Sequence, residues 1–175
     1  MSNIREYQGI TPTIGKDVYI DPASVVIGDV TIGDESSVWP MAVIRGDVHS
    51  IRIGSGTSIQ DGSVLHVTHD GPYSPGGGAL VIGDLVTVGH NVTLHACTIE
   101  DRVLIGMGVI VLDGCHVPSE VILGAGTLVP PNTELESGYL YVGSPAKKLR
   151  PLTDKEKDFL SYTAKNYIKL QKTHQ

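Results

Sequence analysis

The sequence predicts an all-β protein, a parallel β-helix of six-residue repeats followed by one C-terminal α-helix. Three observations carry this prediction. Aliphatic residues recur mainly at every sixth position, glycine follows many of them, and residues 151–175 change to a helical pattern. The 21 glycines and the aromatic content of only 5% are unlike the composition of an ordinary helical or sandwich core.

The first tract of repeats predicts a coil of short strands. Its inward positions hold aliphatic side chains: Ile14, Ile20, Val26, Ile32, Val38, Ile44, Ile53, Ile59 and Leu65. A period of six fits neither an amphipathic helix nor simple strand alternation. It fits a chain that bends after each short strand, so that three six-residue sides of roughly 20 Å close one triangular coil. Successive coils would stack at ~4.8 Å through parallel hydrogen bonds.

An insertion separates this tract from a second one, which runs from Ile82 to Val129. The segment near 70–79, DGPYSPGGGA, is too rich in proline and glycine to continue a strand and is predicted to protrude as a loop. Loops on a rigid scaffold often carry function, and a tolerated surface insertion is an equal alternative.

The C-terminal residues predict a helix that packs on the repeats. Residues 1–150 are therefore assigned to the β-helix domain and residues 151–175 to this helix. Thr153 or Asp154 can cap it, with Glu156 near the third position. Residues at three- and four-residue steps mark the expected apolar face: Phe159, Leu160, Thr163, Tyr167 and Leu170.

Composition excludes several classes of protein. A net charge of −6 argues against a nucleic-acid partner or a polybasic membrane surface. No stretch approaches the ~20 apolar residues of a membrane span, and the N-terminus lacks the apolar core of a signal peptide. Two cysteines are too few for a disulfide framework, so a cytoplasmic protein is expected.

Three histidines are candidates for chemistry: His66 in DGSVLH, and His90 and His95 in VGHNVTLH. A histidine among β-branched residues is more often a hydrogen-bonded structural residue than a ligand, so both interpretations stay open for each one alone. The five-residue step from His90 to His95 places the two rings on adjacent sides of a coil. Such a pair cannot easily close one site within a subunit, and a metal site between subunits explains the spacing.

The repeats, VIRGD…IQDGSVLH, VGHNVTLH and SGYLYVGSPAKKLR together resemble the γ-class carbonic anhydrase-like proteins over nearly the whole chain. The resemblance implies a left-handed β-helix and a homotrimer. It implies one metal ion per interface, bound by His66 and His95 with His90 of a neighbouring subunit. Zn²⁺ is expected, with Fe²⁺ or Co²⁺ as alternatives, because three imidazoles suit zinc and leave a position for water. The implied reaction is reversible hydration of CO₂ to bicarbonate by metal-bound hydroxide.

The same resemblance assigns further residues. Gln60 matches a glutamine that hydrogen-bonds the metal-bound water. Arg45, Asp47 and Asp61 match an interfacial ion-pair network, although for Arg45 and Asp61 a trimer contact without chemistry is an equal alternative. Tyr167 matches a tyrosine that some members place near the metal, with core packing as the alternative.

The chain departs from the best-known γ-class enzymes at two glutamates. Val48 stands at one of these positions and His69 at the other. Hydration of CO₂ must release a proton at each turnover, and a group with a pKa near the working pH does this well. His69 could serve because imidazole titrates near pH 6.5, whereas Val48 could not. The absence of both glutamates puts the carbonic anhydrase activity in question.

Three other functions remain open on this fold. A hexapeptide acyltransferase would use an acyl-CoA donor and one histidine as general base. A metal-dependent thioesterase would keep the metal and change the substrate. A catalytically weak metal-binding scaffold would need neither an acyl-CoA donor nor a thioester substrate.

Overall fold

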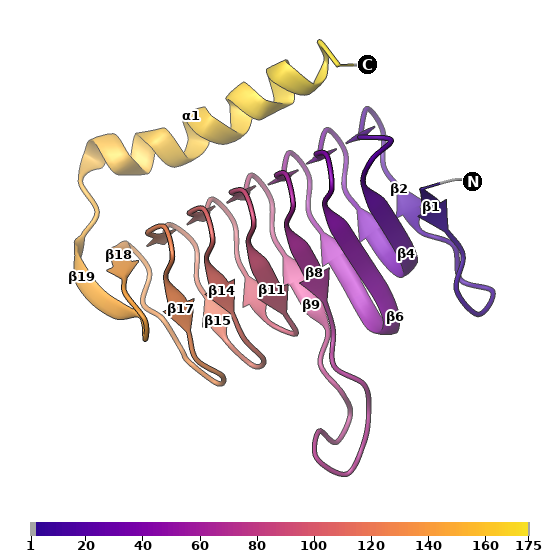
Figure 1. Ribbon diagram of the computed structural model, residues 1–175. Coiled ribbons are helices and arrows are strands. Elements are labelled where there is room, and N and C mark those ends of the chain that lie inside the picture. Colours follow the sequence, from indigo (N-terminus) through magenta and orange to yellow (C-terminus); the bar gives the residue numbers. More distant parts are fainter. Residues whose placement is uncertain (1–2, 175) are drawn as a thin grey trace.

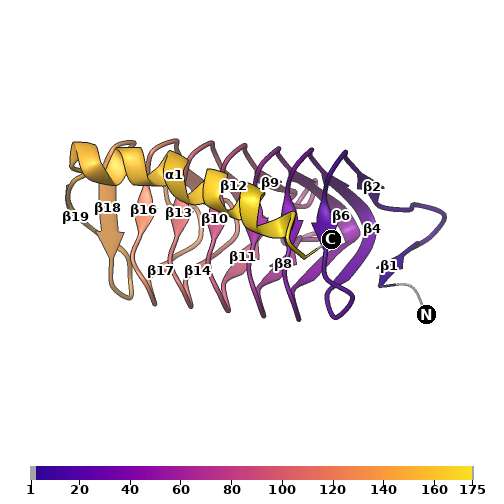
Figure 2. The same cartoon turned by 90° about the horizontal axis from the view of Figure 1, so that it is seen from above.

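A computed structural model describes residues 3–174. Residues 1, 2 and 175, which the predicted domain bounds include, lie outside the described residues. Short strands stack into a coil, and the helix α1 (Asp154–Gln171) runs along one side of it (Figures 1 and 2). No helix in the described range is long and apolar enough to cross a membrane.

Two sheets form the walls of the coil. The 11-stranded sheet contains β1 (Ile4–Arg5), β2 (Thr13–Ile14), β4 (Val25–Ile32), β6 (Val43–Ile53), β8 (Val64–His66), β9 (Leu80–Ile82), β11 (Thr93–His95), β12 (Thr98–Ile99), β14 (Ile110–Val111), β15 (His116–Val117) and β17 (Leu128–Val129). The 8-stranded sheet contains β3 (Tyr19–Ile20), β5 (Ser37–Val38), β7 (Ser58–Ile59), β10 (Thr87–Val88), β13 (Leu104–Ile105), β16 (Ile122–Leu123), β18 (Tyr139–Val142) and β19 (Lys147–Pro151).

The long strand β6 joins two sides of the coil. Its residues Val43 and Ile44 pair with β8, whereas Ile51 to Ile53 pair with β9. Named strands pair in parallel throughout, except that β19 returns antiparallel to β18. The all-β fold class, a parallel β-helix followed by one C-terminal helix, is therefore confirmed.

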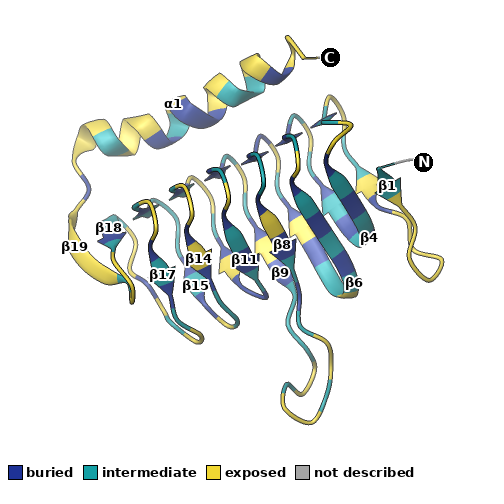
Figure 3. Ribbon diagram, viewed as in Figure 1, coloured by how far each residue is buried: buried dark blue, intermediate teal, exposed yellow. Residues whose placement is uncertain are grey.

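The core is one continuous cluster of buried side chains that contains the stacked aliphatic rows predicted by the six-residue period. Every predicted inward position from Val26 to Val129 is at most 4% exposed. Ile14 and Ile20 are only partly buried, because they lie at the open N-terminal end of the coil. Figure 3 shows this burial along the strands and the exposed outer face of α1.

The insertion leaves the coil between β8 and β9 and projects away from it (Figure 1). At its base the backbone N–H of Thr68 donates to Gly78 O at 3.0 Å, and the Gly78 N–H donates to Thr68 O at 2.9 Å. Gly71 and Ser74 form a second such pair nearer the tip. The base is thus a short antiparallel ladder that closes the insertion and lets the coil resume in register.

The predicted cap of α1 is confirmed at Thr153. Its side chain accepts from the Glu156 N–H, and the Glu156 carboxylate accepts from the Thr153 N–H at 2.9 Å, which satisfies two backbone donors of the first turn.

The predicted apolar face of α1 was wrong at two positions. Leu160 and Thr163 are buried, but Phe159 is 46% exposed and Leu170 is 40% exposed. Gln171 is buried in place of Leu170, because its amide group donates to two backbone carbonyl oxygens of the coil corners at 3.1 and 3.0 Å. The carbonyl oxygens of the coil corners need hydrogen-bond donors, and this need decides which side chain of the last helical turn is buried. The apolar spacing of the helix does not encode it.

His116 is held between carboxylates of the coils on either side. Its Nε2 lies 2.9 Å from Glu100, and its Nδ1 contacts Glu134. Both carboxylates accept only, so the imidazolium form satisfies both contacts. Hydrogen bonds to Glu134 and then Glu100 raise the pKa of His116 above its usual value of 6.5.

We predict a pH-dependent contribution of His116 to stability. Because its folded pKa is raised, the contribution is fully present below pH 6.5 and is lost as the pH rises through the folded pKa. His116→Gln should therefore lower the urea midpoint at pH 6 and leave it unchanged at pH 9. Equal losses at both pH values would contradict this account.

Candidate metal centre

Two of the three candidate histidines lie side by side on the outer surface of one wall. His66 ends β8 and His95 ends β11, and the parallel pairing of these strands sets His95 directly against His66. Residues in register on neighbouring strands point to the same face, so both rings stand on the outside of the coil. The ring centroids are 5.1 Å apart, and His66 Nδ1 lies 3.1 Å from His95 Nε2.

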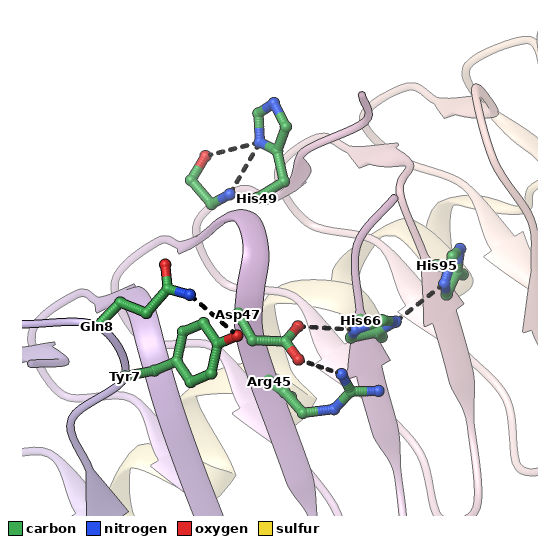
Figure 4. A network of polar contacts seen from close by, with 8 residues as sticks. Tyr7, Gln8, Arg45, Asp47, His49, His66 and His95 are labelled. Carbon is green, nitrogen blue, oxygen red and sulfur yellow. Dashed lines mark hydrogen bonds and ion pairs between the residues drawn. The ribbon is translucent and has the colours of Figure 1, made fainter. Parts of the chain in front are cut away.

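The outer nitrogen of His66 is held by Asp47 of β6. His66 Nε2 lies 3.0 Å from Asp47 Oδ1, while Arg45 forms an ion pair with the other carboxylate oxygen (Figure 4). Burial alone would raise the pKa of Asp47, but the hydrogen bonds from Arg45 and His66 outweigh it, and this pKa falls. Burial lowers the pKa of His66, so the ring is neutral at pH 7, which is the form that binds metals.

The outer nitrogen of His95 is held in the same way by Asp113, which the sequence analysis did not identify. His95 Nδ1 lies 2.6 Å from Asp113 Oδ1, and the Thr68 hydroxyl donates to Asp113 Oδ2. Burial acts to raise the pKa of Asp113, but these two hydrogen bonds lower it overall. Asp113 follows His95 by 18 residues, whereas β11 pairs with β14 at an offset of 17, so Asp113 lies one position beyond the residue in register with His95 and the repeat gave no direct signal for it.

The inner nitrogens of the pair suit a cation. Each outer nitrogen faces an ionised carboxylate and so carries the ring proton. The inner nitrogens then present lone pairs to each other at 3.1 Å, which is unfavourable unless a proton or a cation lies between them. Two tetrahedral zinc–nitrogen bonds of about 2.0–2.1 Å hold their nitrogens roughly 3.3–3.4 Å apart. The observed separation fits two ligands of one such ion.

His90 lies elsewhere in the same chain. It follows β10 at a corner of the coil, where its Nδ1 is 2.9 Å from Asp61 Oδ2 and its side chain is 40% exposed. Within residues 3–174, no three His, Cys, Asp or Glu side chains of one chain gather as a metal site. The structure therefore brings His66 and His95 together and places His90 apart from them.

Gln60 and Tyr167 gather at the His90 corner. Both line a cavity of about 320 Å³ that also contains Asp61 and His90. Gln60 is buried at the end of β7, and the Tyr167 ring packs on the Trp39 ring with centroids 6.0 Å apart. Tyr167 is thus both a packing residue of α1 and a neighbour of His90.

Val48 and His69, the two positions where the sequence analysis expects a departure from the best-known γ-class enzymes, line separate cavities. Val48 is 44% exposed and borders a cavity of about 220 Å³ together with Asp47. His69 lines a cavity of about 420 Å³ beneath the protruding loop, together with Thr68 and Asp113. His69 therefore lines the same cavity as the residue that holds His95.

Comparison with known proteins places this arrangement in a family. Residues 11–46 match the model for bacterial transferase hexapeptide repeats. The protein YrdA of Escherichia coli is 59% identical over 95% of this chain and 90% of its own length. A probable carbonic anhydrase of Methanocaldococcus jannaschii is 42% identical over 91% of this chain and 96% of its own. The mitochondrial gamma carbonic anhydrase 2 of Arabidopsis thaliana is 46% identical over 94% of this chain and 59% of its own length.

Solved structures agree with the fold. A hexapeptide transferase family protein from Anaplasma phagocytophilum superposes with a TM-score of 0.91, 38% sequence identity and 98% coverage of both chains. Sequence relatives named as carbonic anhydrases and this shared β-helix lead to one assignment. The chain belongs to the γ-class carbonic anhydrase-like family of hexapeptide-repeat proteins.

Proposed function

We propose that the protein is a homotrimeric, zinc-dependent carbonic anhydrase that hydrates CO₂ reversibly to bicarbonate. Its metal would be held by His66 and His95 of one subunit and by His90 of a neighbour. The observation that carries the proposal is the facing pair of imidazole nitrogens 3.1 Å apart, each backed by an ionised carboxylate. Fe²⁺ or Co²⁺ would suit the same imidazole ligands.

The position of His90 supports a site shared between subunits. Two histidines leave a tetrahedral ion short of protein ligands, and His90 is half-exposed at a different corner. A neighbour that brings its own His90 to this pair makes a head-to-tail contact, which closes into a ring when repeated by rotation. Exposed apolar side chains near the helix side offer surface for that contact: Met107, Phe159 and Tyr162.

In the proposed reaction, each residue around the zinc ion would have a separate role. When bound, zinc supplies a water acidic enough to yield hydroxide at neutral pH, the nucleophile that CO₂ requires. His66 and His95 would hold the ion through their inner nitrogens. Asp47 and Asp113 hold the outer N–H groups, which fixes the tautomer and the direction of each ring. Gln60, buried beside His90, would orient the water by a hydrogen bond.

His69 is our candidate for removing the proton. Each hydration releases one proton, and Val48 cannot carry it. His69 lines the same cavity as Asp113, the residue that contacts His95. Imidazole titrates near the working pH and can accept a proton and pass it to buffer.

We predict that CO₂ hydration depends on the metal. Stopped-flow hydration by protein of counted zinc content should vanish after chelation and return with added zinc, since hydroxide at neutral pH requires the ion. His95→Ala should behave like the stripped protein, and His116→Ala should keep its metal and activity at pH 8.

A fully metallated protein without activity above buffer would contradict the proposal. Hydrolysis of a thioester by that protein, lost on chelation, would then favour the thioesterase alternative. Saturable binding of acetyl-CoA without any metal would favour the acyltransferase. If neither thioester hydrolysis nor acetyl-CoA binding were observed, a scaffold would be favoured.

For His69 we predict a selective effect on kcat. Proton release follows the interconversion of CO₂ and bicarbonate, so His69→Ala should lower kcat on the order of 10²-fold while kcat/KM is unchanged. Added imidazole buffer should restore kcat, because it can carry the proton from solution. A fall in kcat/KM without rescue by imidazole would show that His69 acts in another way.

A further inference from the structure

The geometry points to Asp113, held by Thr68, as the positioning residue of His95. This inference rests on the metal site proposed above and assigns a function to the insertion that interrupts the repeats. Asp113 would not contact the ion. It would set the direction and the tautomer of the ring that does.

Three consecutive coils supply the arrangement. His95 stacks on His66 through the pairing of β11 with β8, and Asp113 lies one coil further on, two residues after the end of β14. The Asp113 backbone is itself fixed, because its carbonyl oxygen accepts from the Asn132 N–H at 2.8 Å. The carboxylate therefore starts from a defined corner of the coil.

Both carboxylate oxygens of Asp113 have partners. Oδ1 accepts from His95 Nδ1 at 2.6 Å, and Oδ2 accepts from the Thr68 hydroxyl. Thr68 is held in turn by its two backbone hydrogen bonds with Gly78 at the base of the loop. The insertion thus anchors a hydroxyl group, which fixes the rotation of the carboxylate and leaves His95 Nε2 free of a proton.

The other half of the site has the same design. Asp47 accepts from His66 with one oxygen and from Arg45 with the other. Thr68 contacts the second carboxylate oxygen of Asp113, just as Arg45 contacts the second carboxylate oxygen of Asp47. A carboxylate that was only a solvated turn residue would not need two side-chain partners from two other coils, and outer partners of ligating histidines usually tune metal affinity.

Metal affinity of the whole protein tests the inference. Zinc binding would be measured by competition with a chromophoric chelator for the wild type, Asp113→Asn, Thr68→Val and Thr68→Ser. Asp158→Asn is the matched control, since Asp158 is exposed on α1. We expect Asp113→Asn to weaken zinc binding by about 10- to 100-fold. Thr68→Val should weaken it by a smaller factor, and Thr68→Ser, which keeps the hydroxyl, should bind like the wild type.

A second readout needs no metal. Imidazole ¹⁵N shifts of His95 in the stripped protein should report the Nδ1–H tautomer in the wild type and a mixture of tautomers in Asp113→Asn. If the Asp113 and Thr68 variants unfold at the same midpoint as the wild type and Asp158→Asn, their folding is intact.

The outcomes separate the two proposals. Wild-type affinity and an unchanged His95 tautomer in Asp113→Asn would overturn the role of Asp113 and leave the metal site standing. A wild type that binds no zinc would overturn the proposed function and this inference with it. Weakened zinc binding in Asp113→Asn together with wild-type zinc binding in Thr68→Val would show that Asp113 positions His95 without Thr68. That result would overturn the role inferred for the insertion.

Discussion

Stacking of parallel coils in register is the constraint on which the rest of this structure depends. It sets Leu94 over Leu65 inside the coil and, by the same pairing, His95 over His66 outside it. One hydrogen-bonded ladder therefore builds the apolar column and the polar surface together. A histidine pair on such a rigid wall is preorganised, because neither backbone needs to move to bring the two rings within reach of one ion.

The polar surface on this wall forms a chain of contacts parallel to the coil axis. Arg45, Asp47, His66, His95 and Asp113 follow one another, with a carboxylate on each side of the two imidazole rings. Carboxylates stabilise the outer N–H groups, and burial disfavours a charge on His66.

The sequence predicted the parts of the fold that the six-residue period governs and missed the parts set by single polar contacts. Aliphatic spacing identified the core from Val26 to Val129, but it could not show that carbonyl oxygens at the coil corners would bury Gln171 instead of Leu170. His66 and His95 are 29 residues apart because the insertion lengthens that coil. Asp113 lies on the next coil, but β11 pairs with β14 at an offset of 17 residues, so a register count from His95 would have led to Leu112 instead.

The most direct test of a metal held between subunits is complementation between two defective chains. A His90→Ala chain and a His66→Ala/His95→Ala chain would be dissociated, mixed in equal amounts and reassembled, and zinc counted in the trimers of about 56 kDa, three chains of 18.6 kDa. Neither variant alone should bind zinc, while about a quarter of the interfaces in random trimers should regain a complete site. Mixed trimers without zinc, or a His90→Ala trimer with full occupancy, would contradict the account.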